Sequence, residues 1–153
     1  MMSEIQQRYQ AVCERITQAA LQAGRPAIQV QLLAVSKTFA AEQVREVAAL
    51  GQRDFGENYV QEGVDKIAAL KDVPGLAWHC IGPLQSNKTR PVAEHFDWVH
   101  SVDRLKIAQR LSEQRPADLP PLNICLQVNI DGGPTKAGVS PSDALALAQA
   151  VSE

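Results

Sequence analysis

The stretch that decides the fold is Gln31-Leu-Leu-Ala-Val-Ser-Lys-Thr38. Its first six residues form a short and nearly continuous apolar run, which predicts a buried strand over residues 31–36. The strand leads into Lys37 and Thr38 without a glycine. A doubly wound dinucleotide-binding sheet would normally have a glycine-rich turn at this position. We therefore favour a barrel over an open doubly wound sheet.

Outward from this strand, predicted strands and helices alternate along the whole chain. Strand starts recur at intervals of roughly 20–25 residues, which is typical of βαβ units in a parallel sheet. The expected strands lie at 31–36, 53–56, 76–81, 97–101 and 123–130, and the expected helices lie at 4–23, 41–50, 59–71, about 87–95, 103–112 and from 140 onward. We expect Gly24 and Gly51 to end two helices, and Asp103 and Ser140 to cap two others.

The number of units limits the architecture. A complete (β/α)₈ barrel needs about 200 residues or more, and the sequence has 153 residues. We therefore expect an α/β fold, a partial (β/α)₈ TIM barrel. It would contain about five of the eight β/α units plus an N-terminal helix. Residues 1–153 would form a single incomplete barrel domain.

Composition and charge exclude several classes of protein. The formal net charge is -2, with 45% hydrophobic and 21% charged residues. This balance gives no electrostatic reason to expect binding to nucleic acid or to an anionic membrane. The sequence has no apolar run as long as a membrane span and no signal-peptide core at its start, so we expect a cytoplasmic protein. The spacing of Cys13, Cys80 and Cys125 matches no zinc motif, and we expect Cys80 and Cys125 to be buried.

Lys37 is the strongest candidate for chemistry. In parallel barrels the active site lies at the carboxyl ends of the strands, and Lys37 follows the first strand almost directly. A lysine at the rim of an apolar barrel is partly desolvated, which favours the neutral amine. A neutral amine can form a Schiff base with an aldehyde, and pyridoxal 5′-phosphate (PLP) is the common cofactor of this kind. The alternative is a lysine that extends into water from a strand end.

Three further residues accompany Lys37 at expected strand ends. Asn58 follows the second strand, where it either caps the next helix or binds a ligand. His79 alternates with apolar neighbours, which fits a satisfied core histidine as well as a site residue. Lys136 lies in a glycine-containing loop that is either a plain turn or a mobile cover over the barrel mouth. We also expect Gly56 to allow a tight turn from strand to helix.

Four segments together resemble one family, the YggS/PROSC pyridoxal phosphate homeostasis proteins. The matching segments are Leu33-Ala-Val-Ser-Lys37, Phe55-Gly-Glu-Asn-Tyr59, His79-Cys-Ile-Gly-Pro-Leu-Gln-Ser-Asn-Lys88 and Thr135-Lys-Ala-Gly138. They occur in the family's order and spacing over nearly the whole chain. The third segment is the most specific of the four.

The resemblance implies a barrel like the N-terminal domain of alanine racemase, with PLP held as a Schiff base on Lys37. It implies that Asn58 and His79 line the cofactor pocket and that Lys136 is a second lysine near it. No catalytic residue and no metal ligand is expected. The function implied is intracellular PLP (vitamin B6) homeostasis without robust catalysis, with PLP-dependent apoenzymes as partners. One alternative is a racemase-like PLP enzyme.

Family members continue well past residue 153. In such barrels the phosphate usually lies at the loops after strands seven and eight, which this chain lacks. A second alternative is therefore a truncated barrel that no longer binds PLP, and we expect low cofactor occupancy. We also expect self-association through the unpaired edges of the first and fifth strands.

Overall fold

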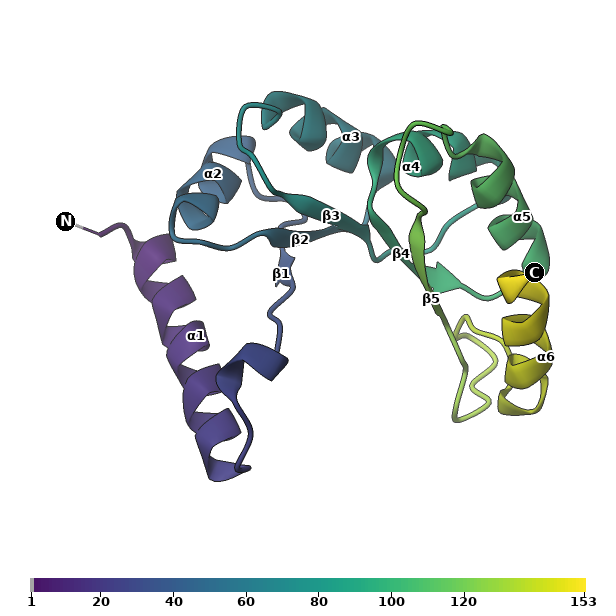
Figure 1. Cartoon of the computed structure of the whole chain (residues 1–153), viewed down its shortest axis with the longest axis horizontal. Helices are drawn as coiled ribbons and strands as arrows, with labels where there is room; N and C mark the ends of the chain where they lie inside the picture. The colour runs from purple at the N-terminus through teal and green to yellow at the C-terminus, as the bar shows by residue number, and fades with distance from the viewer. Residues whose placement is uncertain (1) are drawn as a thin grey trace.

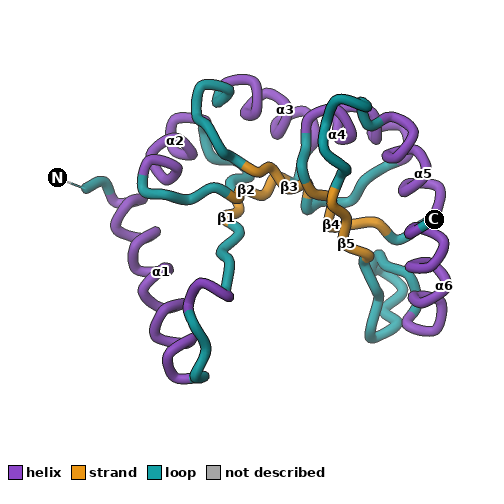
Figure 2. Tube along the Cα trace, viewed as in Figure 1, coloured by secondary structure: helices purple, strands orange, loops and turns teal. Residues whose placement is uncertain are grey.

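The computed structural model describes residues 2–153 and shows a sheet curved into an arch (Figures 1 and 2). All five strands are parallel, in the order β1-β2-β3-β4-β5. Helices α2 to α5 cover the convex side of the arch, while α1 and α6 lie at its two ends (Figure 1). The strands are β1 (Ala34–Val35), β2 (Asp54–Glu57), β3 (Ala77–Cys80), β4 (Trp98–Val102) and β5 (Asn123–Leu126). The α-helices are α1 (Glu4–Gln22), α2 (Ala41–Ala49), α3 (Val60–Ala69), α4 (Thr89–His95), α5 (Leu105–Gln114) and α6 (Pro141–Ser152). The expected partial barrel of five β/α units and an N-terminal helix is confirmed.

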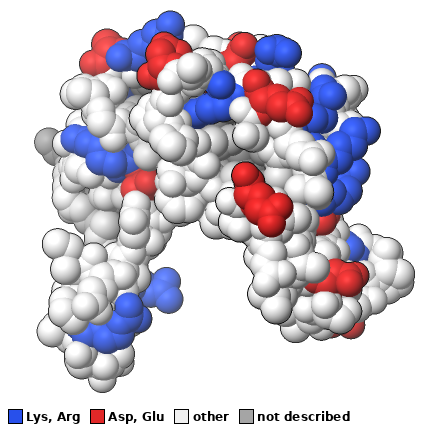
Figure 3. Space-filling model, turned by 45° about the vertical axis from the view of Figure 1, so that its right-hand side comes forward, with Lys and Arg blue, Asp and Glu red and all other residues white. Residues whose placement is uncertain are grey.

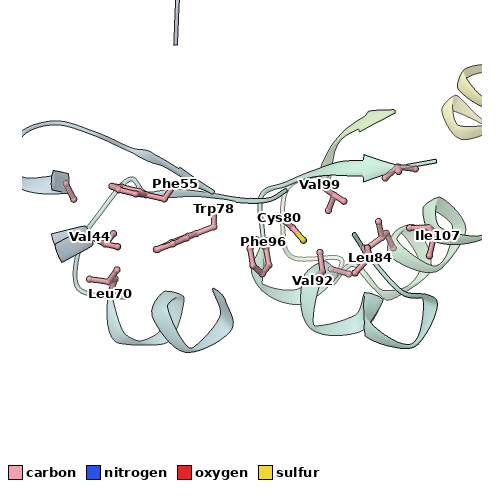
Figure 4. Packing of buried hydrophobic residues seen from close by; sticks show 14 of the residues in the cluster. Val44, Phe55, Leu70, Trp78, Cys80, Leu84, Val92, Phe96, Val99 and Ile107 are labelled. Atoms are coloured by element: carbon pink, nitrogen blue, oxygen red, sulfur yellow. The ribbon is translucent and has the colours of Figure 1, made fainter. Parts of the chain in front are cut away.

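The hydrophobic core lies between the sheet and the helices of the convex side. Figure 4 shows side chains such as Val44, Leu70 and Ile107 in this layer. Phe55 and Trp78 are register partners on β2 and β3, with ring centroids 5.7 Å apart. Burying a large apolar side chain stabilises a fold by about 1.5–3 kcal/mol, so each of these aromatic residues anchors the sheet to its helices.

The concave side of the sheet is left for other side chains. Directly paired residues of parallel strands point to the same side, and the register joins Val35 to Gly56, Gly56 to His79 and His79 to Trp98. These four positions alternate with the core residues, so they belong to the concave side. Val35 is 47% exposed there. Figure 3 shows the hollow between the two ends of the arch, where most surface atoms belong to uncharged residues.

Two strands are shorter than the sequence predicted. The first was expected over 31–36 as a buried strand, but β1 contains only two residues and one of them, Val35, is largely exposed. β1 is an edge strand with one neighbour, and the carbonyl of Leu32 is bound by the side chain of Gln52 instead of by a strand. The fifth strand was expected to reach residue 130, but β5 ends at Leu126 and only an isolated bridge continues beyond it. The length of an edge strand depends on how far it pairs with its neighbour. An apolar run in the sequence does not contain this information.

The other elements start and end within two residues of their expected positions. A 3-10 turn, Ser86–Lys88, precedes α4. Gly24 and Gly51 follow the ends of α1 and α2 with φ of 68° and 109°, so the expected glycine stops are confirmed. A left-handed conformation after a helix favours glycine because it has no Cβ.

Of the two predicted helix caps, Asp103 is wrong and Ser140 is confirmed in its position. Arg104, not Asp103, is the N-cap of α5, and no side chain caps that end. The carboxylate of Asp103 instead accepts a hydrogen bond from the backbone of Gly138 at 3.2 Å. Ser140 does occupy the N-cap of α6 with Pro141 following, but its hydroxyl binds the carboxylate of Asp143 instead of the helix backbone. Asp103 thus binds a backbone group outside its own helix, and Ser140 binds a side chain in the first turn of its helix.

The cysteines follow the prediction in part. Cys80 is buried, and this burial raises the pKa of its thiol to about 11. Cys125 is only half-buried, because β5 lies at the sheet edge. Within residues 2–153, every helix is too short or too polar to cross a bilayer.

Candidate functional site

Lys37 lies in a turn at the carboxyl end of β1. The last strand residue before it is Val35, and the backbone of Ser36 still donates to the carbonyl of Gly56 at 2.9 Å. The side chain of Lys37 is exposed, so the desolvation that we predicted for it is not provided by residues 2–153. The reason is that β1 is the edge of the arch and its concave side is open.

The residue after Lys37 has an uncommon backbone. Thr38 has a φ of 67°, and it is the only described non-glycine residue with a positive φ. A β-branched residue in the left-handed region costs about 1–3 kcal/mol and persists only where neighbouring contacts hold it. Glu62 provides such a contact, because its Oε1 accepts the Thr38 N–H at 2.6 Å. The turn at Lys37 is therefore imposed by its surroundings.

Asn58 lies at the same end of the sheet, one residue beyond β2. The N-cap of α3 is Tyr59, so the helix-capping interpretation of Asn58 is wrong. Its side-chain Oδ1 is buried and has no hydrogen-bond partner. Buried polar atoms are paired in the great majority of cases, and an unpaired one needs an explanation. Asn58 thus offers a free hydrogen-bonding group beside the Lys37 turn.

Two glycines let the backbones approach one another here. A Cβ on Gly82 would lie 2.4 Å from the carbonyl oxygen of Asn58, so no other residue fits after β3. Gly56 is inside β2 and faces Ile81, with 3.1 Å between a Cβ and the Ile81 side chain. The expected role of Gly56 in a strand-to-helix turn is therefore wrong, and its role is close packing on the concave side.

His79 lies within β3, on the concave side of the sheet, and is hydrogen-bonded at both ring nitrogens. Its Nε2 is 2.9 Å from Asp54 Oδ1, and its Nδ1 is 2.8 Å from His100 Nε2. The ring also stacks on Trp98, with centroids 5.4 Å apart and an interplanar angle of 6°. A carboxylate only accepts, so His79 donates through Nε2 and, when neutral, accepts through Nδ1 from His100. The interpretation as a satisfied histidine agrees with these contacts.

Asp54, His79 and His100 form a hydrogen-bonded row across three strands, and burial affects the pKa of its last member. Desolvation, and then the neighbouring His79, lower the pKa of His100 below its usual value of 6.5. Sequence reasoning missed both Asp54 and His100. Their signal was the alternation with period two, since each belongs to a strand at a position that shares a side with His79. Recognising them required the register between strands.

Lys136 lies in the loop after β5, at the edge of the sheet opposite β1. Its Nζ is 2.5 Å from Asp131 Oδ2, and this ion pair lowers the pKa of the Asp131 carboxyl. Asn129 binds the loop internally, donating to the carbonyls of Gly133 and Lys136. These contacts favour the plain-turn interpretation of the loop. The structure does not bring Lys136 beside Lys37, whereas it does bring Lys37 and Asn58 to one end of neighbouring strands.

A buried lysine on α3 was also missed. Lys66 lies four residues after Glu62 on the same helix, and the two form an ion pair at 2.9 Å. The side chain is only 8% exposed, however, and it also contacts Glu57 and the backbone of Ser36. The i, i+4 spacing signals a pair but not its burial. Among the described residues, no cluster of His, Cys, Asp and Glu could hold a metal ion.

The curved parallel sheet with helices on its convex side defines the class of fold, a partial (β/α)₈ barrel. Residues 8–153 match the family model "Alanine racemase, N-terminal domain", and the chain belongs to this family. The chain is 63% identical over 152 residues to the pyridoxal phosphate homeostasis protein of Pseudomonas aeruginosa, and 53% identical over 154 residues to that of Escherichia coli strain K12. Each alignment covers 99% of this chain and 66% of the relative.

A solved structure shows the same similarity. PipY of Synechococcus elongatus PCC7942, solved with PLP bound, is 44% identical and superposes with a TM-score of 0.75. The superposition covers 93% of this chain and 64% of PipY. The chain thus spans about two thirds of the length of the relatives it matches. Its resemblance to the PLP homeostasis proteins, stated above from four motifs, is confirmed.

Proposed function

We propose that this chain binds PLP covalently through Lys37 and that it serves in PLP homeostasis as a carrier of the cofactor. The support from comparison is that relatives at 53–63% identity bear the name pyridoxal phosphate homeostasis protein, and that PipY has been solved with PLP bound. PLP supplies an aldehyde that condenses with a lysine amine. The chain's own part is to present that amine and to orient what binds beside it.

The observation on which the proposal depends is the pairing of Lys37 with Asn58. The two follow neighbouring strands, β1 and β2, at the same carboxyl end. One offers an exposed primary amine, and the other offers a buried Oδ1 without a partner. A polar heteroaromatic aldehyde has hydrogen-bonding groups that such an amide can match. The residues present therefore fit the cofactor at its reactive end.

The other two predicted residues have supporting parts in the proposal. His79 is held by Asp54 and His100, so its ring is fixed on the concave side, below the level of Asn58. We assign it to the wall of the pocket. We assign Lys136, which is paired with Asp131, the role of a second lysine on the β5 side. PLP would contact its amine on entry or release.

The covalent attachment is tested by reductive trapping. The chain is incubated with excess PLP, reduced with borohydride and digested, and the pyridoxyl-lysine peptides are quantified by mass spectrometry. We expect the modification to concentrate on Lys37 and to vanish in Lys37→Arg, which keeps the charge. Equal modification of exposed lysines such as Lys71 and Lys106 would contradict the proposal and favour a fragment that does not bind PLP.

The carrier role is tested against the enzymatic alternative. The PLP-loaded protein, not treated with borohydride, is incubated with a single enantiomer of alanine. The product is then analysed for the other enantiomer. We expect no sustained turnover, and we expect PLP-loaded protein to reactivate a PLP-dependent apoenzyme while a scavenger removes free PLP. Sustained racemisation, or reactivation that the scavenger abolishes, would contradict the carrier role.

Partners and location follow as parts of the same proposal. We place the protein in the cytoplasm, with PLP-dependent apoenzymes as clients. β1 and β5 each have one neighbouring strand within residues 2–153, and open strand edges tend to pair. We therefore expect concentration-dependent self-association of the chain, measured by analytical ultracentrifugation. A single monomeric species at all concentrations would contradict this part.

A further inference from the structure

A buried ammonium group lies behind the Lys37 turn, on the helix side of the sheet. Lys66 of α3 donates to the carbonyl oxygen of Ser36 at 2.6 Å and to Glu62 Oε1 at 2.9 Å. Its Nζ also lies 2.6 Å from Glu57 Oε1. The ammonium therefore donates two hydrogen bonds, and the Glu57 carboxylate neutralises its charge as an ion-pair partner. One of these three oxygens belongs to the backbone immediately before Lys37.

A second link reaches the backbone immediately after Lys37. Glu62 Oε1, which binds Lys66, also accepts the N–H of Thr38 at 2.6 Å. The hydrogen bond from Lys66, followed by that from Thr38, lowers the pKa of the Glu62 carboxyl, so it is ionised at neutral pH. Lys66 and Glu62 thus hold both flanks of Lys37 without touching its side chain.

The backbone conformation of Thr38 indicates that these hydrogen bonds keep the turn in an unfavourable geometry. Its φ of 67° is unfavourable for a β-branched residue. The N–H of Phe39 donates to the carbonyl of Ser36 at 3.1 Å and closes the turn. Such a bond forms with either orientation of the central peptide, so Glu62, the acceptor of the Thr38 N–H, is the contact that favours the observed orientation. The opposite orientation of the peptide between Lys37 and Thr38 would redirect the Lys37 side chain.

We propose that Lys66 and Glu62 form a clamp that fixes the left-handed turn at Thr38 and thereby aims the Lys37 amine at the concave side of the sheet. The proposal rests on the proposed function, because it takes Lys37 as the attachment point for PLP. Glu62 and Lys66 are positioning residues: they act through the backbone of Ser36 and Thr38, from the side of the sheet opposite the pocket.

The clamp itself is tested first, without cofactor. Glu62→Ala removes the acceptor, and the Glu62 side chain is 32% exposed, so the variant leaves no deep cavity. Asp65→Ala is the matched control. It removes an exposed carboxylate from the same helix, and the only described hydrogen bond of that carboxylate is from the Gln61 side chain. We expect amide hydrogen exchange at Thr38 to be about tenfold faster in E62A than in the wild type, as for loss of a charge-assisted hydrogen bond. D65A should match the wild type.

The positioning role is tested by the trapping experiment described above. The readout is the pyridoxyl label on Lys37 divided by that on Lys106, which corrects for cofactor and reductant. We expect E62A to lower this ratio severalfold while its melting temperature stays near that of D65A. A ratio unchanged in E62A, or slow exchange at Thr38 in E62A, would overturn the clamp.

A rescue distinguishes positioning from a general loss of structure. Glycine adopts the left-handed conformation without penalty, so Thr38→Gly in the E62A background should return part of the Lys37 label. No recovery in E62A/T38G would overturn the proposed route through the Thr38 backbone. If Lys37 of the wild type is labelled no more than Lys106, the proposed function fails, and the Thr38 exchange rates then decide the clamp alone.

Discussion

His79 Nδ1 lies 2.8 Å from His100 Nε2, so two imidazoles on neighbouring strands share one hydrogen bond in the concave wall of the sheet. Asp54 accepts from the far nitrogen of His79 and completes a row across β2, β3 and β4. The row has one carboxylate for two rings. The hydrogen bond persists when His100 gains a proton, but the added charge is partly desolvated and lies beside His79, which disfavours that protonation.

We predict that folding stability falls as the pH drops below about 6.5. The folded-state pKa of His100 lies below its usual value, first through desolvation and then through His79. The unfolded state therefore binds a proton that the folded state refuses, so stability is present above pH 6.5 and is lost as the pH falls toward the folded pKa. Urea unfolding at several pH values measures this. His100→Gln should flatten the profile, and an unchanged profile would contradict the assignment.

We predict that Gly82→Ala is destabilising by about 1–3 kcal/mol, the usual effect of overpacking. The new Cβ would lie 2.4 Å from the Asn58 carbonyl, a backbone atom that cannot move independently. Gly133→Ala is the control, because its Cβ would meet only side-chain atoms of Asp131 and Lys136, at 3.3 Å. Chemical denaturation measures both. Equal stability of the two variants would show that the Gly82 contact relaxes freely.

We predict that Lys66→Met destabilises the fold by about 3–5 kcal/mol, because it leaves a buried carboxylate without its partner. Glu57 is 1% exposed in its side chain, and beyond the Lys66 contact neither of its oxygens has a hydrogen-bond partner. Burial already raises the pKa of this carboxyl. The double variant K66M/E57L should recover much of the loss when both are measured by urea unfolding. Additive losses in the double variant would argue against the pair.

We predict that Arg115→Ala destabilises the fold by about 1.5–3 kcal/mol, the range for hydrogen bonds made by a charged group. The guanidinium donates to the carbonyls of Ala93 and Phe96 at 2.8 and 2.6 Å, and to that of Pro120 at 3.0 Å. It thus ties the end of α4 to the loop before β5. Arg104→Ala, an exposed arginine, is the control for charge. Thermal unfolding measures the stability of both variants. Equal melting temperatures of R115A and R104A would contradict this role.

Much of the architecture was encoded in local sequence. Apolar runs and glycine stops predicted five strands and their helices because these signals depend on neighbouring residues only. The length of β1 was not predictable in this way, since residues 31–36 contain the apolar run but lack a second strand to pair with. Lys37 was predicted as a site residue because it follows that apolar run directly. The structure places it at the expected strand end.

The sequence by itself thus determined the alternation of strands and helices, their parallel direction and the position of Lys37 at the end of the first strand. Only the tertiary structure decided which side of the sheet each polar residue occupies and what it binds. Asp54, His79 and His100 meet across three strands, and Lys66 meets Ser36 from a helix 30 residues later. Such contacts depend on the register between distant segments, which packing sets and which no local pattern contains.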